Sequence, residues 1–304
     1  MGRYLRIYKT FFSSSLAREL EFRANFFAKV LQNLVWIGFF LLIILVVYRN
    51  ADSVAGWTRG EAFVLAATCF LMNAMVGAFF MSLQEIPEQV RRGTLDFVIT
   101  KPIDTQFWVS ARRFNFDQIG TLVAGIAMVA VGVVQAGLVP SAPQWIAYLV
   151  LLAASTAIFY AFNLALMTLG IWLVRVDNLW VLGETVMQVA RFPIDIYSLG
   201  VQRVLTYFLP LAFIATIPAR QLAKGFDLQM LGLGVLWALV ALGAFVFIGE
   251  TLTPLGWIGL AAISCGIALL AFYIVSTLTS QNSGGGGPVA LEISNTVGAS
   301  SYSL

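Results

Sequence analysis

Long uncharged apolar runs dominate this chain of 304 residues. Each run is about as long as the roughly 20 residues that an α-helix needs to cross the hydrocarbon core of a bilayer. The runs cover residues 30–48, 62–83, 119–139, 146–174, 228–248 and 255–278. Only 11% of the residues are charged, against about 25% in an ordinary soluble domain. The sequence therefore predicts an all-α polytopic membrane protein and excludes a water-soluble globule.

The composition also argues against several classes of function. The apolar runs leave no polar segment large enough for a nucleotide-binding, catalytic or nucleic-acid-binding domain, and the net charge of +3 is too small to suggest nucleic acid. The sequence contains no histidine, the commonest metal ligand. Cys69 and Cys265 lie inside apolar runs without CxxC spacing, so we expect neither a disulfide framework nor a metal site. We therefore expect no enzymatic activity and no directly bound cofactor.

The amino-terminal segment, residues 1–29, carries basic residues interleaved with apolar ones near helical spacing. This pattern predicts an amphipathic helix that lies at the membrane surface. Twelve Lys and Arg residues occur in this segment, in the loop 84–117 and at Arg175, whereas the alternate loops hold two. Because positive charge favours the cytoplasmic side, the amino terminus is predicted to be cytoplasmic.

The segment 178–224 is interrupted by charged residues and prolines. Either its first part crosses the membrane and its second part dips back, or the first part lies flat and the second crosses; both arrangements place Lys224 outside. Glu184, Gln188 and Arg191 lie near one helical face. Broken segments and intramembrane charges often line transport pathways, so these three residues are candidates for the translocation pathway. The alternative is an ion pair or interfacial charge with a structural role.

Glycines recur within the predicted spans. They are Gly125 and Gly132 in one run, and Gly232, Gly234 and Gly243 in another. Small residues let helices approach closely, so these positions predict tight helix packing, within the chain or in a dimer.

The loop 84–117 is too long for a plain turn. Glu85 and Glu88 flank Pro87 near a plausible helix start, and Arg91 and Arg92 precede a glycine that can end the helix. These preferences predict a short surface helix. The alternative is a solvated connector whose charges only set the membrane topology.

This loop resembles the coupling-helix loop of ABC-2-type exporter permeases. The resemblance rests on the pattern E-x-x-x-x-V-R-R-G-T-L-D-x-x-x-x-K-P at residues 85–102, and residues 192–219 also resemble a subgroup of bacterial ABC-2 permeases. The resemblance implies an interfacial helix followed by six transmembrane helices, with a re-entrant excursion before the last, in a permease domain of residues 30–248. It also implies that one set of residues couples the permease to an ATPase: Glu85, Pro87, Glu88, Arg91, Arg92, Gly93, Thr94, Leu95 and Asp96.

The function implied by the resemblance is that of a permease subunit of an ATP-driven exporter in a bacterial plasma membrane. ATP and Mg²⁺ would bind a partner ATP-binding cassette ATPase, and a second permease copy or a related permease would complete the pathway. The uncharged spans favour a lipid-like or amphiphilic substrate.

The sequence departs from this family after about Gly249. Residues 249–272 are similar to a terminal helix of drug/metabolite transporters, and they predict an extra span within residues 249–280. Residues 281–304, rich in glycine and serine, predict a disordered tail. A self-contained ion-coupled secondary transporter, with Glu184 as proton acceptor, is therefore the alternative function.

Overall fold

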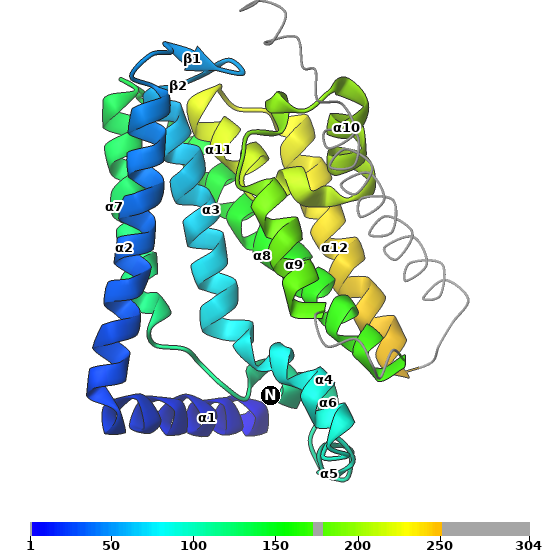
Figure 1. Ribbon diagram of the computed structural model, residues 1–304. Coiled ribbons are helices and arrows are strands. Elements are labelled where there is room, and N and C mark those ends of the chain that lie inside the picture. The colour runs from blue at the N-terminus through cyan, green and yellow to red at the C-terminus, as the bar shows by residue number, and fades with distance from the viewer. Residues whose placement is uncertain (1, 173–178, 251–304) are drawn as a thin grey trace, which may run out of the picture. The chain divides into compact units, whose positions relative to one another are not determined.

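The computed structural model describes residues 2–172 and 179–250 of the chain. Its longer helices are α1 (Gly2–Glu21), α2 (Arg23–Val47), α3 (Arg59–Phe80), α7 (Gln118–Gln135), α8 (Ala142–Trp172), α9 (Leu179–Ala190) and α12 (Leu228–Glu250). A two-stranded antiparallel hairpin joins α2 to α3 and consists of β1 (Ser53–Val54) and β2 (Trp57–Thr58). The hairpin end of the described part carries β1 and β2, and the opposite end, called the α1 end, carries α1 (Figure 1).

Shorter elements fill two connecting segments. Between α3 and α7 lie η1 (Met81–Glu85), α4 (Ile86–Arg91), α5 (Asp96–Ile99) and α6 (Thr105–Ala111). Between α9 and α12 lie η2 (Ile194–Ile196), α10 (Leu199–Arg203), η3 (Val204–Phe208), η4 (Pro210–Phe213) and α11 (Thr216–Ala223).

Four helices among the described residues are long and apolar enough to cross a membrane, namely α2, α3, α7 and α8. They correspond to the first four predicted spans, so the prediction of an all-α polytopic membrane protein is confirmed. In α12, the apolar stretch with described side chains is Leu228–Gly243. The predicted span within residues 249–280 and the predicted tail lie outside the described residues, apart from the last two positions of α12.

The boundary between the interfacial helix and the first span differs from the predicted one. Phe22 separates α1 from α2, so Arg23 and Lys29 belong to α2 and not to the surface helix. Long basic side chains can extend from the end of a span to the headgroup region, and charges there do not end the helix. The apolar run starting at residue 30 therefore marks the beginning of hydrophobic burial, not that of the helix.

α3 and α8 form the centre of the described part (Figure 1). α3 packs against α2, α7, α8 and α11, and α8 packs against α4, α9, α11 and α12. The most apolar stretches of α3 and α8 are 67% and 72% buried, against 17% for α2 and 28% for α7. α2 and α7 therefore present most of their apolar surface outward, as lipid-facing helices would.

Glycines allow α3 and α7 to approach closely. A Cβ atom on Gly132 would lie 2.9 Å from the backbone nitrogen of Val64, and one on Gly60 would lie 2.4 Å from that of Ala136. The predicted tight packing at Gly132 is thus a contact within the chain. On α12, by contrast, a Cβ on Gly232 would meet no atom within 4 Å.

The segment after α9 leaves the hairpin end and returns to it. The Trp57 indole nitrogen donates a hydrogen bond of 2.8 Å to Asp195, and Asp195 also forms an ion pair with Arg220. The segment between Asp195 and Arg220 therefore begins and ends at the hairpin end.

Two contacts with α8 show how far this excursion reaches. At the hairpin end, the Gln144 side chain donates to the carbonyl oxygen of Gln221, whereas Ser155 donates to that of Phe213. Eleven residues of α8 separate Gln144 from Ser155, a rise of about 16 Å along a helix. The chain thus dips deep beside α8 before α11 brings it back, which agrees with the first of the two predicted arrangements.

Candidate functional site

The loop at the α1 end contains a short helix whose ends follow from the sequence. Pro87 occupies the first turn of α4, where a missing backbone N–H has no intrahelical partner to lose. Gly93 ends the helix with a positive φ of 65°, a conformation that glycine adopts without strain. The backbone nitrogen of Thr94 then donates to the carbonyl oxygen of Gln89 at 2.9 Å. This turn directs the chain from α4 towards α5.

The outer face of α4 carries a small charge cluster. Glu88 forms ion pairs with both Arg91 and Arg92. Hydrogen bonds from Arg92 and then Arg91 lower the pKa of the Glu88 carboxyl. The side chain of Glu88 is 41% exposed and that of Arg92 is 71% exposed, so the cluster is accessible to a partner.

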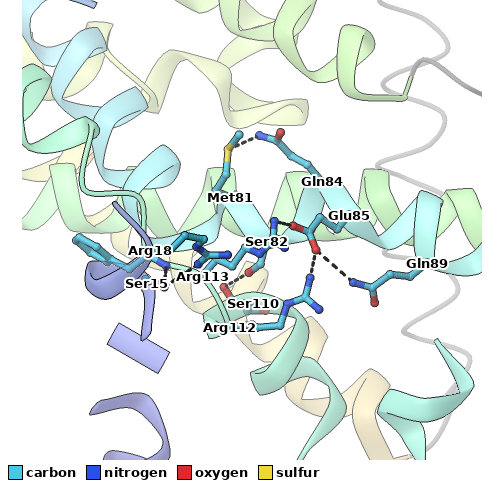
Figure 2. A network of polar contacts seen from close by, with 11 residues as sticks. Ser15, Arg18, Met81, Ser82, Gln84, Glu85, Gln89, Ser110, Arg112 and Arg113 are labelled. Atoms are coloured by element: carbon cyan, nitrogen blue, oxygen red, sulfur yellow. Dashed lines mark hydrogen bonds and ion pairs between the residues drawn. The ribbon is translucent and has the colours of Figure 1, made fainter. Parts of the chain in front are cut away.

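Glu85 has a different environment, between α4 and the end of α6. Its carboxylate forms ion pairs with Arg112 and Arg113, as Figure 2 shows. Next to it, the Ser82 hydroxyl donates to the carbonyl oxygen of Ser110 at 2.8 Å. These contacts tie the beginning of the loop to its end, so Glu85 holds the loop together from a partly buried position.

The loop is also tied to α8. The hydroxyl groups of Ser110 and Tyr160 lie 2.8 Å apart, and Gln106 donates to the Tyr160 oxygen at 3.2 Å. Because Tyr160 belongs to α8, a displacement of α6 would move α8 as well as α3.

Beyond Gly93 the loop exposes apolar side chains. Phe97 is 70% exposed and Ile99 is 60% exposed, while Val98 between them is buried. Thr94 and Asp96 are exposed too, and Leu95 is half-buried. The α4–α5 surface, defined here by Glu88, Arg91, Arg92, Asp96, Phe97 and Ile99, thus combines charges with exposed apolar groups. An apolar patch with a charged rim is typical of a protein interaction site.

The hairpin end holds a second polar network. Glu61, near the start of α3, accepts hydrogen bonds from the backbone nitrogen of Thr58 at 2.8 Å and from Lys224 at 2.6 Å. Together with the bonds of Asp195 to Trp57 and Arg220, these contacts link the hairpin, α3 and α11. A pocket of about 620 Å³ opens beside Asp195, Arg220 and Lys224.

A smaller pocket of about 240 Å³ lies among α3, η1, α7 and α8. Its polar lining consists of carboxamides, from Asn73, Gln84, Gln118 and Asn163, and its walls include Phe80 and Phe159. The Asn73 and Asn163 amides each donate to a carbonyl one turn earlier on their own helix. Both contacts use the amide nitrogen, and the oxygen of each carboxamide can accept a hydrogen bond from a ligand.

The comparison with protein families decides the class of the chain. The family model described as "ABC-2 family transporter protein" matches residues 34–253. The chain belongs to the ABC-2 transporter family. No curated protein and no solved structure matches it significantly.

Family membership confirms the resemblance of the chain to ABC-2-type permeases. The match ends at residue 253, close to Gly249, where the resemblance was predicted to end. ABC-2 permeases are the membrane subunits of ABC transporters and are not themselves catalytic, and they normally work with an ATP-binding cassette ATPase.

Of the three predicted pathway residues, the structure describes the side chains of Gln188 and Arg191. The backbone of Glu184 lies in α9, but its side chain is outside the described part. Gln188 is exposed. The Arg191 guanidinium lies 5.6 Å from the centre of the Phe40 ring on α2, a cation–π contact. This contact favours a packing role for Arg191.

Several site residues escaped the sequence reasoning. Phe97 and Ile99 were indistinguishable from ordinary apolar residues, although their position just after the charged motif of a cytoplasmic loop is a usable signal. Asn73 and Asn163 were hidden inside apolar runs, where a single amide does not interrupt the hydrophobic pattern. In a membrane span such an amide needs a partner, which makes it a candidate site residue.

Proposed function

We propose that this chain is the permease subunit of an ATP-driven exporter and that its α4–α5 surface receives the ATPase. The observation that carries the proposal is the exposure of Glu88, Arg92, Phe97 and Ile99 on a loop anchored to both central helices. Charged rims around apolar groups favour specific docking.

ATP binding would close two ATPase subunits and push on α4. Because η1 and α4 continue from α3, and because Glu85 holds Arg112 and Arg113, the push would tilt α3 together with the α6 end of the loop. The Ser110 to Tyr160 contact would carry the displacement to α8. Coupling of this kind needs two states with different contacts at the loop.

The carboxamide pocket suits the polar part of an amphiphilic substrate. Its oxygens and N–H groups can bind uncharged polar groups, and its aromatic walls can receive an apolar tail. At about 240 Å³ it is smaller than the roughly 300 to 1,000 Å³ of most ligand sites, so the inward-open state would have to widen it. A second copy of the permease, or a related permease, would supply the other wall of the pathway.

The asymmetry of Lys and Arg places the α1 end in the cytoplasm, where the ATPase, ATP and Mg²⁺ would be. In this orientation the carboxamide pocket lies towards the cytoplasmic side, since Leu83 and Gln84 of η1 line it. Loading from that side and release at the hairpin end correspond to export across a bacterial plasma membrane.

The test begins with purification of the permease from its native membrane and identification of the chains that accompany it. We expect an ATP-binding cassette subunit. With that ATPase, the double variant Glu88→Ala/Arg92→Ala and the single variant Phe97→Ser should lower the ATP hydrolysis that the permease stimulates in nanodiscs. They should also lower transport of a fluorescent phosphatidylcholine probe. The abundance of the permease should not change, because these side chains are exposed.

The matched control is Arg49→Ala/Asp52→Ala, which removes one charge of each sign at the hairpin end. Recovery of the permease without any nucleotide-binding chain would contradict the proposed class. Normal stimulation of hydrolysis by both α4–α5 variants would leave the class intact but show that the ATPase docks elsewhere.

A further inference from the structure

A strongly basic pocket of about 490 Å³ lies between α1 and the α6 end of the loop. Arg18 and Ser14 contribute from α1, and Lys101, Arg112 and Arg113 contribute from the loop. Within residues 2–172 and 179–250, no Asp or Glu lines it. The pocket is formed because α1 docks on the loop, where the rings of Tyr4 and Phe107 lie 5.0 Å apart and those of Phe12 and Phe114 also 5.0 Å apart.

The positive charge of this basic pocket is only partly neutralised. Glu85 is one carboxylate shared by two guanidinium groups, those of Arg112 and Arg113. Burial, followed by repulsion from Arg113 and Arg18, lowers the pKa of Arg112 to about 10. Among the described residues, the buried Nε atom of Arg112 has no hydrogen-bond partner. The site therefore holds more donors and more positive charge than its described neighbours satisfy.

The cations of the basic pocket are held in place before any ligand binds. The Lys101 ammonium lies 4.4 Å and the Arg112 guanidinium 4.2 Å from the centre of the buried Trp108 ring. Arg18 donates to the hydroxyl of Ser15 at 3.3 Å, and that hydroxyl accepts from the backbone nitrogen of Phe114 at 3.2 Å. Fixed cations lose little side-chain entropy when an anion binds, which favours a built site over a diffuse charged surface.

We propose that this basic pocket binds a phosphate group and that an anionic phospholipid headgroup is its source. Guanidinium groups match the geometry of phosphate oxygens and can bind them in pairs. A lipid source is favoured because the pocket borders α1, which exposes Leu5, Leu16 and Leu20 as a surface helix in a membrane would. Basic pockets on the cytoplasmic side of membrane proteins bind such headgroups.

A headgroup bound here would join α1 to the end of the loop. It would contact Arg18 on one side and Lys101 and Arg112 on the other, and so add a lipid-dependent link to the aromatic contacts between them. The position of the loop would then depend on the anionic lipid content of the membrane. This inference concerns a site separate from the α4–α5 surface and does not require an ATPase.

The test uses purified full-length permease in nanodiscs of phosphatidylcholine, with and without phosphatidylglycerol, and in neutral detergent with inorganic phosphate. Native mass spectrometry measures retained phosphatidylglycerol, and thermal unfolding measures the stabilisation. Arg18→Gln and Lys101→Gln should each weaken retention about five- to ten-fold, as expected for one basic group at an anionic surface. Lys101→Arg keeps the positive charge and should retain the lipid as the unmodified permease does. This variant therefore distinguishes the loss of charge from a loss of folding.

Arg6→Gln and Lys9→Gln are the matched controls, because they remove the same charges from exposed positions of α1 that do not line the pocket. If the pocket variants and the control variants lose lipid retention equally, the proposal is overturned, because the effect then comes from the general surface charge of α1 and the loop. Inorganic phosphate could stabilise the permease as much as phosphatidylglycerol does, and Lys101→Gln could abolish this stabilisation. That result would support the phosphate site but overturn the lipid source. If the pocket variants retain lipid normally but co-purify with less ATPase, the proposal is overturned. The pocket would then bind acidic side chains of a partner protein.

Discussion

Replacing Asp195 by alanine should destabilise the hairpin end of the permease, because one carboxylate there holds two groups from distant parts of the chain. It accepts the indole N–H of Trp57, 138 residues away, and pairs with Arg220, 25 residues away. The variant removes both contacts at once. The excursion between Asp195 and Arg220 would then lose the link between its two ends.

The expected cost follows from the exposure of each partner. Trp57 is only 1% exposed, so loss of the acceptor of its N–H would cost about 1–3 kcal/mol. The side chain of Arg220 is 36% exposed, and its ion pair contributes about 0–1 kcal/mol. We expect a total of about 1–4 kcal/mol for Asp195→Ala. Asp195→Asn keeps an oxygen for Trp57 and should cost less than about 1 kcal/mol.

The assay is unfolding by titration with dodecyl sulfate in mixed micelles, followed by tryptophan fluorescence. Asp52→Ala is the control, since Asp52 is an exposed acid at the same end of the molecule. A double-mutant cycle with Trp57→Phe isolates the hydrogen bond, and contacting residues typically give coupling energies of about 0.5–3 kcal/mol.

Two results would refute this reasoning. If Asp195→Ala unfolds no more easily than Asp52→Ala, the network at the hairpin end does not stabilise the fold. If Asp195→Ala and Trp57→Phe are additive, the indole N–H does not depend on Asp195, and the excursion is held by its other contacts, such as those of Gln221 and Phe213 with α8.

Three further predictions concern topology, packing and the broken segment. In a background without the native cysteines, an impermeant thiol reagent applied to intact cells should label a cysteine at Ser141 and spare one at Thr94; the reverse pattern would overturn the orientation. Gly132→Ala should destabilise the permease by about 1–3 kcal/mol by overpacking, whereas Gly232→Ala, on an open helix face, should be neutral or slightly stabilising in the same titration. Glu184→Gln should lower transport more than abundance if the carboxylate lines the pathway, because an ionised carboxylate at mid-membrane costs at least ~2.5 kcal/mol unless it is paired or hydrated. Wild-type transport by Glu184→Gln near neutral pH would remove the main argument for an ion-coupled transporter.

The spans and the short helix of the loop were predictable because their causes are local. A bilayer of fixed thickness imposes the length of each apolar run, and Pro87 and Gly93 limit α4 through their own backbone preferences. Neither inference requires knowledge of what a residue contacts.

The polar networks were not predictable because their causes are distant in the sequence. The sequence reasoning treated Glu85 as a charge near a helix start, whereas its partners Arg112 and Arg113 come from the other end of the loop. Asp195 was only one of several charges that interrupted an apolar segment, and its acceptor role for Trp57 depends on how the excursion folds back. Pairing across such distances is decided by packing, which composition and periodicity do not encode.

α3 connects the two polar networks of the permease. With η1 and α4 it forms a continuous helical stretch from Arg59 to Arg91, and Glu61 and Glu85 lie near its two ends, about 36 Å apart along a helix. Each carboxylate is held by cations from other segments: Lys224 at the hairpin end, and Arg112 and Arg113 at the α1 end. The close glycine contacts with α7 lie at Gly60 and Val64, beside Glu61, so they fix the hairpin end of α3, and a push at α4 would move the opposite end of the helix most. In the proposed mechanism, Glu61 and Lys224 therefore tie the excursion to the fixed end of α3, while displacement by the ATPase acts on the other end of α3 and, through Ser110 and Tyr160, on α8.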